Sequence, residues 1–323
     1  MNESCIVCMN GLREGDIAIA RYLQHHCFNR PVSRAAPHKM AFSSATCETL
    51  SKLTAISVTL DAEVPTLAII TFTRPERLNS FTETMYNDLC DAFLALDRDE
   101  AASAVLIRAS GRYYSSGADL GEQAKGMQHV MSSGVDLREY LTQRVRLNAH
   151  RLVGIMIDFT KPIVAAVHGP AVGISVTTLA LCDMVYAAEA ATFHTPFMQF
   201  GFCAEGCSSV LFADIMGVSK ASEVLLLGKT MTAHEAERAG FVSEVFASEL
   251  FGEQVLQRAR KLASFPPNAL RQTKWLMREP QRQRLHDANE REITLLVDRF
   301  MSEESTSAVL KFMMERQAMR AKM

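Results

Sequence analysis

The sequence predicts an α/β fold with a helical C-terminal section. Short apolar runs of strand length alternate with helix-spaced patterns up to about Ser248, and after that point only helix-spaced patterns remain. The 323 residues are enough for one domain with a large core, which needs neither disulfides nor a structural metal. We therefore expect one αβ domain that ends in helices.

Four strands are expected, at residues 66–72, 104–108, 163–167 and 184–187. Between the first two strands, apolar residues recur at helix spacing and predict a strand–helix–strand unit: Met85, Leu89, Ala92, Phe93 and Leu96. A further helix is expected after Gly173, between the last two strands. Thr232 and Glu235 have the spacing of a capping box at the start of a short helix.

The remaining helices are expected at 248–264 and 266–278, followed by two segments between residues 281 and 320. This gives three parts: an N-terminal extension over 1–50 that can be poorly ordered, a core over 51–248, and a C-terminal helical section over 249–323.

Composition excludes several classes of protein. The formal net charge of −2 argues against nucleic acid as the main partner, because neutralising phosphates needs a basic surface. No charged residue lies between Lys161 and Asp183, but Gly169-Pro170 and Gly173 interrupt that stretch, so it predicts strand, turn and helix rather than a membrane span. The scattered cysteines, with no second pair to complete Cys5-x-x-Cys8 as a metal site, favour a reducing compartment.

The two chain ends carry possible addresses. An acid-poor N-terminal stretch with arginines is typical of mitochondrial transit peptides, although Glu3, Glu14 and Asp16 weaken that interpretation. The C-terminal tripeptide Ala321-Lys322-Met323 is a variant of the Ser-Lys-Leu peroxisomal address. A peroxisome or related organelle is therefore the expected location, and the mitochondrion is the alternative.

Three glycine-bearing turns define a candidate site. The first, 113–120, follows a predicted strand and contains Ser115-Ser116-Gly117-Ala118-Asp119-Leu120. The second, 168–174, lies between a strand and a helix start, and the third, 201–209, places Glu205 among small residues. Turns of this kind leave backbone N–H groups free and let a ligand approach closely, so they can stabilise an oxygen that gains negative charge.

The order of these turns resembles the crotonase (enoyl-CoA hydratase/isomerase) superfamily over roughly residues 55–280. The matching stretches are 72–81 (FTRPERLNSF), 115–120 (SSGADL), 161–169 (KPIVAAVHG), 228–233 (GKTMTA) and 267–274, which begins PNA and ends TK. The resemblance implies a spiral of ββα turns that binds acyl-CoA thioesters and assembles into trimers or dimers of trimers, with 249–323 as the trimerisation section. No cofactor is implied beyond coenzyme A as part of the substrate.

The same resemblance implies roles for particular residues. The backbone N–H groups of Ser116 and Ile174 would hold the thioester oxygen. Asp119 can instead cap or brace its own turn. The residues expected to contact substrate are Arg74, Arg77, Ser115, Gly117, Ala118, Asp119, Leu120, Gly173, Phe197 and Lys274, with an arginine and Lys274 as candidates for the coenzyme A phosphates.

The acidic residues point to one reaction. Family hydratases use two glutamates, and this chain has Thr177 and Phe197 at those positions, which disfavours water addition. Glu205 stands where hydratases carry glycine, as in peroxisomal-type Δ3,Δ2-enoyl-CoA isomerases. One carboxylate can remove a proton at C2 and return it at C4, so Glu205 is the expected catalytic base.

The pKa of Glu205 is expected to reflect two opposed effects. Apolar neighbours would raise it, whereas a helix N-terminus would lower it, and we expect the two to offset partly. The alternatives are a non-catalytic acyl-CoA-binding member of the superfamily, a dienoyl-CoA isomerase and a hydratase.

Overall fold

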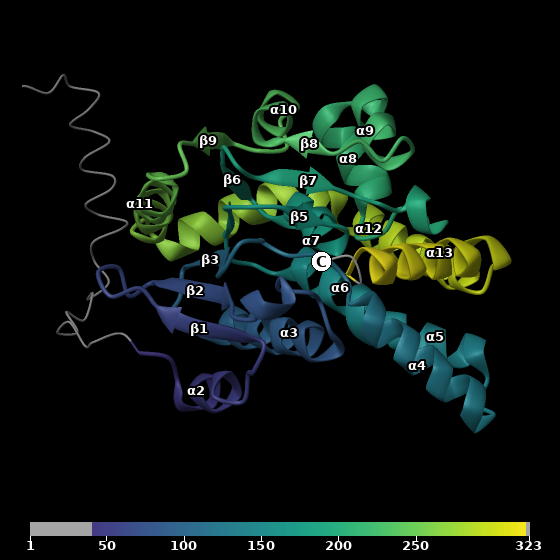
Figure 1. Ribbon diagram of the computed structural model, residues 1–323. Helices are drawn as coiled ribbons and strands as arrows, with labels where there is room; N and C mark the ends of the chain where they lie inside the picture. Colours follow the sequence, from purple (N-terminus) through teal and green to yellow (C-terminus); the bar gives the residue numbers. More distant parts are fainter. Residues whose placement is uncertain (1–40, 321–323) are drawn as a thin grey trace, which may run out of the picture. The chain divides into compact units, whose positions relative to one another are not determined.

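The computed structural model describes residues 41–320 (Figure 1). Residues 1–40 of the expected extension and the tripeptide 321–323 lie outside the described residues. Residues from the end of the expected extension form helix α2 (Ser44–Leu50). Its N-cap residue Ser43 donates its backbone N–H to Asp99 Oδ2 at 2.8 Å, which ties α2 to the end of helix α3 (Glu83–Arg98). Residues 44–50 of the predicted extension are therefore helical.

The central sheet has six strands in the order β1-β2-β3-β4-β6-β9. Their bounds are β1 Ile56–Leu60, β2 Leu67–Phe72, β3 Ala104–Ala109, β4 Ile163–Val167, β6 Met184–Ala188 and β9 Glu244–Phe246. All neighbours pair in parallel except β1 and β2. The four predicted strands are β2, β3, β4 and β6. The prediction relied on continuous apolar runs and therefore missed both edge strands, because β1 alternates apolar with polar residues and β9 is only three residues long.

Helices cover both faces of this sheet. In β2, Ala68 and Ile70 face the core that contains α3 and α6 (Arg151–Asp158). Leu67 and Ile69 face the opposite way, onto α11 (Phe251–Ala263). Strands buried on both faces are typical of parallel sheets, which explains why they appear in the sequence as continuous apolar runs.

A small second sheet carries the turns of the candidate site. It is formed by β5 (Ala171–Val172), β7 (Thr192–His194) and β8 (Met231–Thr232). Helix α7 (Ile174–Thr177) follows β5, and α8 (Ser208–Met216) and α9 (Val218–Leu225) follow β7. The capping box predicted for Thr232 and Glu235 is present at the start of α10 (Ala233–Arg238). Helices α4 (Leu120–Ser133) and α5 (Leu137–Val145), not predicted, lie between β3 and α6.

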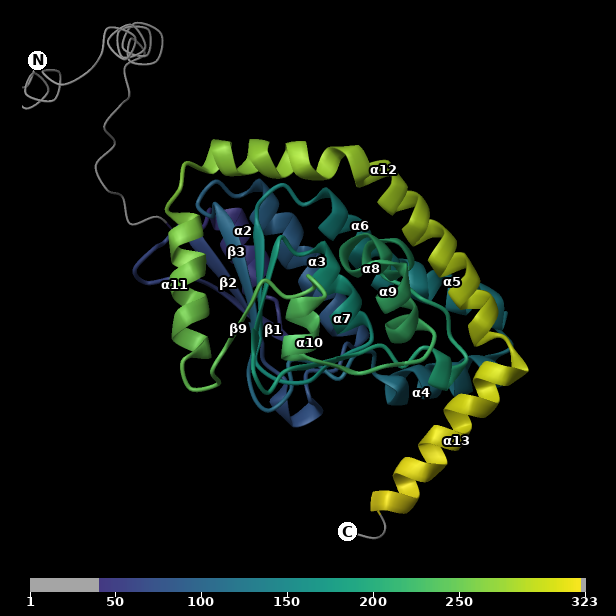
Figure 2. The same ribbon diagram turned by 90° about the horizontal axis from the view of Figure 1, so that it is seen from above.

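The C-terminal section is helical, but its division was predicted wrongly. A single helix, α12 (Pro267–Phe300), runs through Pro280, and α13 (Glu303–Arg320) follows it. Proline in a helix costs about 3 kcal/mol. Contacts on both sides of Pro280 offset this cost: Arg278 donates to Cys182 O at 2.9 Å, and Leu285 is packed in the main core. Figure 2 shows α12 bending part-way along its length.

Within residues 41–320, none of the helices is long and apolar enough to cross a membrane.

We expect the α3 contact with the chain before β4 to be a main source of stability. Phe93 is 1% exposed, and its ring meets that of Phe159 edge to face at 5.0 Å. Phe93→Ala should lower the free energy of unfolding by about 3–5 kcal/mol, measured by urea denaturation. The control is Phe265→Ala, since Phe265 is 47% exposed and its loss should cost about 0.5 kcal/mol or less. Equal losses in the two variants would contradict this packing.

Candidate active site

The first glycine turn packs directly against the second. Gly117 adopts a φ of +77°, and a Cβ placed on it would lie 2.6 Å from Val172 O. Only glycine allows both the left-handed backbone and this close approach. Ser115 secures the turn, because its Oγ donates to Asn79 O at 2.7 Å and accepts from Gly117 N at 3.1 Å.

The predicted N–H donor in the first turn is not available. Ser116 N donates to Leu78 O at 2.9 Å. Ala118, two residues later, is the centre of a parallel bridge in which Phe81 N donates to Gly117 O and Asp119 N donates to Phe81 O. The N–H of the central residue in such a bridge points away from the paired strand. Among the described residues Ala118 N has no acceptor, so we move the donor assignment from Ser116 to Ala118.

The second turn presents the N–H of Ile174. Gly173, with a φ of +60°, donates its own N–H to His194 O at 2.8 Å and accepts from the N–H groups of Val176 and Thr177. Ile174 is the first residue of α7, and its N–H has no acceptor within the described part of the chain. The two glycine turns therefore each leave one backbone donor, Ala118 and Ile174, without a partner.

Asp119 and Leu120 start helix α4. The Asp119 carboxylate caps the helix by accepting from Glu122 N at 3.0 Å, and it also accepts from Ser80 Oγ at 3.0 Å. Burial opposes ionisation, but these hydrogen bonds outweigh it and lower the pKa of Asp119. Of the two roles expected for Asp119, substrate contact and bracing of its own turn, the structure shows the second.

Glu205 is buried in the third turn, with 6% of the residue exposed. Its Oε1 accepts from Thr177 Oγ1 at 3.1 Å, whereas Oε2 is buried without a hydrogen-bond partner. Gly206 adopts a φ of +67°, and a Cβ on it would lie 2.4 Å from Thr177 Oγ1, so the turn needs glycine here. Thr177, which stands where hydratases carry an acid, thus holds one oxygen of Glu205 and leaves the other free for chemistry.

The expected offset in the pKa of Glu205 does not occur. Burial, and secondly the negative charge of Glu292, raise the pKa of Glu205 to about 8, while the Thr177 hydrogen bond lowers it only in part. Glu292 on α12 accepts from Cys207 N at 2.7 Å and Ser209 N at 3.0 Å. Because these N–H groups open helix α8, its positive end interacts with Glu292 rather than Glu205.

The two predicted arginines have different environments. Arg74 is partly buried, and its Nη1 donates to Thr82 Oγ1 at 2.9 Å and Ser80 O at 3.2 Å, beside the start of α3. Arg77 is exposed and forms no ion pair with any residue in 41–320. Of the pair, Arg77 has the guanidinium free to meet a phosphate.

Lys274 has a structural role within the chain. It is 8% exposed, and its Nζ pairs with Asp183 Oδ2 at 2.9 Å and donates to Lys161 O at 2.7 Å. An ammonium held this way attaches α12 to the core. We therefore remove Lys274 from the phosphate-binding candidates.

Aromatic residues surround the third turn. Phe197, at the second hydratase acid position, is 5% exposed, and its carbonyl accepts from the N–H groups of Phe200 and Phe202. The Phe202 ring meets Phe300 of α12 at 4.8 Å, and Phe200 meets Phe312 of α13 at 5.0 Å. The C-terminal helices therefore pack against one side of this turn.

Sequence reasoning missed several residues that build the site. Asn79 is fully buried and joins its own loop to the loop after β3, accepting from Arg74 N and donating to Ser110 O and Tyr113 O. Its place in the 72–81 motif was a signal for this role. Tyr86 of α3 is buried close enough to Glu205 that burial, followed by the charge of Glu205, raises its pKa. Nothing in the sequence marked Tyr86 or Glu292.

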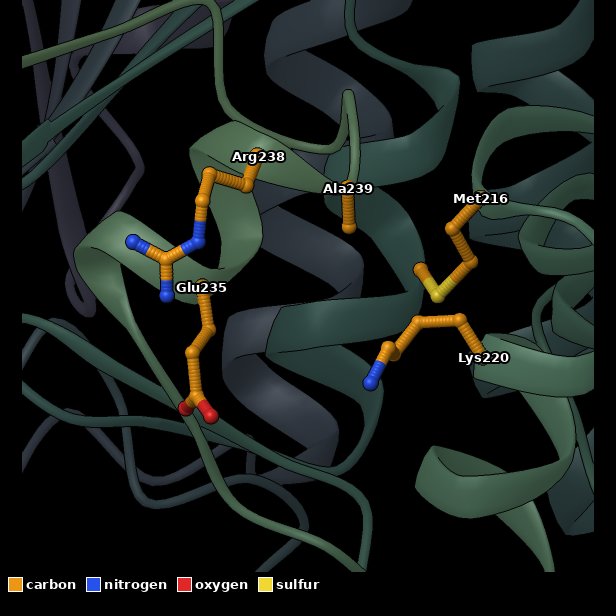
Figure 3. Close-up of a pocket in the computed structure, with 5 residues that line it drawn as sticks. All are labelled: Met216, Lys220, Glu235, Arg238 and Ala239. Atoms are coloured by element: carbon orange, nitrogen blue, oxygen red, sulfur yellow. The ribbon is translucent and has the colours of Figure 1, made fainter.

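A separate surface hollow of about 280 Å³ lies between α8–α9 and α10 (Figure 3). Its lining residues are Met216, Lys220, Glu235, Arg238 and Ala239, none of which belongs to the glycine turns. Lys220 pairs with Glu223, and Glu235 pairs with Lys229 and caps α10, so most of its charges are already matched. In residues 41–320 no three His, Cys, Asp or Glu side chains cluster as a metal site.

Comparison with known proteins shows the family to which this fold belongs. Residues 63–320 match the family model for enoyl-CoA hydratase/isomerase, and the chain belongs to this family. Its α/β crotonase fold is also that of an enoyl-CoA hydratase/isomerase from Pseudoalteromonas atlantica T6c, with a TM-score of 0.71 and 29% identity, covering 81% of this chain and 98% of that one.

Relatives from human and mouse are among those named as isomerases. The chain is 42% identical over 247 residues to enoyl-CoA delta isomerase 2 of Homo sapiens, covering 76% of this chain and 60% of that protein. It is 38% identical over 244 residues to peroxisomal enoyl-CoA delta isomerase 3 of Mus musculus, covering 76% of this chain and 74% of that protein. The chain thus spans about three-fifths of the length of the human relative.

The close approach of the two turns can be tested with glycine variants. Gly117→Ala should combine a strained positive φ with a clash against Val172 O, and should lower the free energy of unfolding by about 2–4 kcal/mol. Gly134→Ala is the matched control, because Gly134 has a φ of +73° but no atom within 4 Å of its added Cβ. Chemical denaturation should therefore show the smaller loss for Gly134→Ala, and similar losses would argue against the packed turns.

The raised pKa of Glu205 predicts a pH-dependent penalty on stability. A carboxyl whose pKa rises from 4.5 unfolded to about 8 folded contributes stability fully below pH 4.5, and loses it as pH rises through about 8. Glu205→Gln should match the wild type near pH 4.5 and become more stable than it as pH rises, by up to about 1.4 kcal/mol per pH unit. Thermal unfolding of both proteins from pH 4.5 to 9 measures this, and parallel curves would rule out the raised pKa.

Proposed function

We propose that this chain is an isomerase that shifts the double bond of 3-enoyl-CoA to give trans-2-enoyl-CoA, as in the β-oxidation of unsaturated fatty acids. The observation that carries the proposal is Glu205: a buried carboxyl with one oxygen held by Thr177 and the other without a partner. The two positions where a hydratase needs acids hold Thr177 and Phe197. The isomerase names of the two relatives support the same reaction.

The proposed chemistry needs one base and two backbone donors. Glu205 Oε2 would take a proton from C2 of the bound acyl chain and return it at C4, so that the carboxylate is regenerated. The electrons shift into a dienolate whose negative charge collects on the thioester oxygen. The N–H groups of Ala118 and Ile174 would stabilise that oxygen, each by about 2.7–4 kcal/mol if they act like other oxyanion-hole donors.

We propose that coenzyme A binds at the loop before α3, which carries Arg74 and Arg77. Arg77 is the proposed phosphate contact. Arg74 would position the loop that carries Arg77, because it donates to Thr82 Oγ1 at the start of α3. Residues 115, 117, 118, 120 and 173 would meet the thioester through their backbone, and Phe197 would border the acyl chain. Coenzyme A enters as part of the substrate.

We also propose that the chain assembles as a homotrimer or a dimer of trimers. Large apolar side chains lie exposed on and just after α9 (Val218, Leu226 and Leu227) and on α12 (Trp275, Leu276 and Met277), and a second copy could cover them. A peroxisomal location remains a proposal, supported by the name of the mouse relative.

Glu205→Gln should remove isomerase activity while substrate binding persists. We expect kcat with 3-hexenoyl-CoA to fall by about 100-fold or more, because an amide cannot accept the proton, while the Kd for a saturated acyl-CoA from calorimetry changes little. The control is Glu189→Gln, an exposed position that should retain wild-type activity. Full activity in Glu205→Gln would refute the proposed base.

The same assays separate the alternatives. A wild-type protein that binds acyl-CoA without moving the double bond would be a non-catalytic member of the family. Conversion of a dienoyl-CoA, or hydration of crotonyl-CoA well above background, would instead favour a dienoyl-CoA isomerase or a hydratase. Tests with cis- and trans-3-enoyl-CoA of several lengths would also define the preferred chain length.

A further inference from the structure

Helix α12 holds the Glu205 turn through a second buried carboxylate. Glu292 is 5% exposed, and its two oxygens accept separate backbone hydrogen bonds, Oε2 from Cys207 N and Oε1 from Ser209 N. Arg299 of the same helix donates its Nε to Gly201 O at 2.7 Å, at the other end of the turn. One helix is therefore hydrogen-bonded to the turn both before and after Glu205.

The hydrogen bonds decide which of the two carboxyls carries the charge. Burial raises the pKa of Glu292, but an N–H donor on each of its two oxygens opposes that rise. Glu205 receives one hydroxyl, from Thr177, and its Oε2 has no donor. The first proton taken up by the pair therefore resides on Glu205, and Glu292 is the member that ionises first.

Helices α7 and α3 and the turn itself supply the other groups around Glu205. Helix α7 contributes the neutral Thr177 hydroxyl, and α3 contributes Tyr86. The turn itself contributes Cys203 and Cys207, whose thiols, like the Tyr86 hydroxyl, have raised pKa values because they are buried, and so stay neutral. Among the described residues, Glu292 is the charged group that acts on Glu205.

We propose that Glu292 is a positioning residue for the proposed base: it fixes the Glu205 turn to α12 and withholds the positive end of α8 from the Glu205 carboxylate. This inference rests on the proposed function. A helix N-terminus left open beside Glu205 would stabilise its ionised form and make it a weaker base. With Glu292 in place, Glu205 is a strong base that is ionised only in part near neutral pH.

The test is the pH dependence of isomerisation in Glu292→Gln. In the wild type, kcat/KM should rise with pH up to about 8, because Glu205 must be ionised to take the proton. Glu292→Gln removes the charge, so the rising part of this pH profile (the acidic limb) should move to lower pH by about one unit or more. The rate on the high-pH plateau should fall several-fold. Glu290→Gln makes the same change on α12 at a half-exposed position paired with Arg146 and His150, and should leave the limb in place.

Glu292→Asp keeps the charge but draws it back from the turn. Its limb should move in the same direction by a smaller amount, so this variant alone decides the question if Glu292→Gln does not fold. A limb that stays within about 0.2 units of the wild type in the folded variants, with only kcat or Tm reduced, would overturn the proposal and leave Glu292 as a structural brace.

A readout without catalysis separates this inference from the proposed function. The stability gained by Glu205→Gln should grow from about pH 4.5 and level off near pH 8 in the wild-type background. It should level off at lower pH, with a smaller total gain, in the Glu292→Gln or Glu292→Asp background. If no isomerase activity exists, the proposed function fails but this shift remains measurable. If the shift is absent, the Glu292 inference fails whatever the activity.

Discussion

The burial of one carboxyl group without a basic partner constrains the rest of this structure. Taking a carboxylate out of water is costly unless hydrogen bonds or an opposite charge compensate, and Glu205 has only the Thr177 hydroxyl. The surroundings must therefore be rigid enough to keep the group in place. The Gly206 backbone, the aromatic residues beside the turn and the anchors from α12 provide that rigidity.

The two free backbone donors depend on a different constraint. Each lies next to a glycine in the left-handed region, Gly117 before Ala118 and Gly173 before Ile174, so the chain turns sharply and the following N–H leaves the hydrogen-bonded ladder. The parallel sheet ends directly before these turns and holds them together. The donors are thus preorganised by the fold, which avoids reorganisation when charge develops nearby.

The C-terminal helices are part of the site although they contribute no group to the proposed chemistry. Helix α12 continues through Pro280 because Lys274 and Arg278 on one side, and Leu285 on the other, are fixed to the core. Its far half then reaches the Glu205 turn with Glu292 and Arg299. A change that loosens α12 would therefore alter the position and the pKa of Glu205, so the packing of the last helices affects the proposed base.

The sequence by itself determined the central strands, the capping box at Thr232, the candidate base and the absence of acids at Thr177 and Phe197. The strands and the capping box follow from local apolar patterns and from residue type, which need no long-range geometry. The candidate base and the significance of Thr177 and Phe197 come from the resemblance to the family. It did not determine that Ser116 N is already bonded whereas Ala118 N is free, that Lys274 pairs with Asp183, or that Glu292 takes the α8 N-terminus. Those outcomes were decided only by the tertiary structure, because hydrogen bonds and buried charges depend on which atoms from distant segments meet in space.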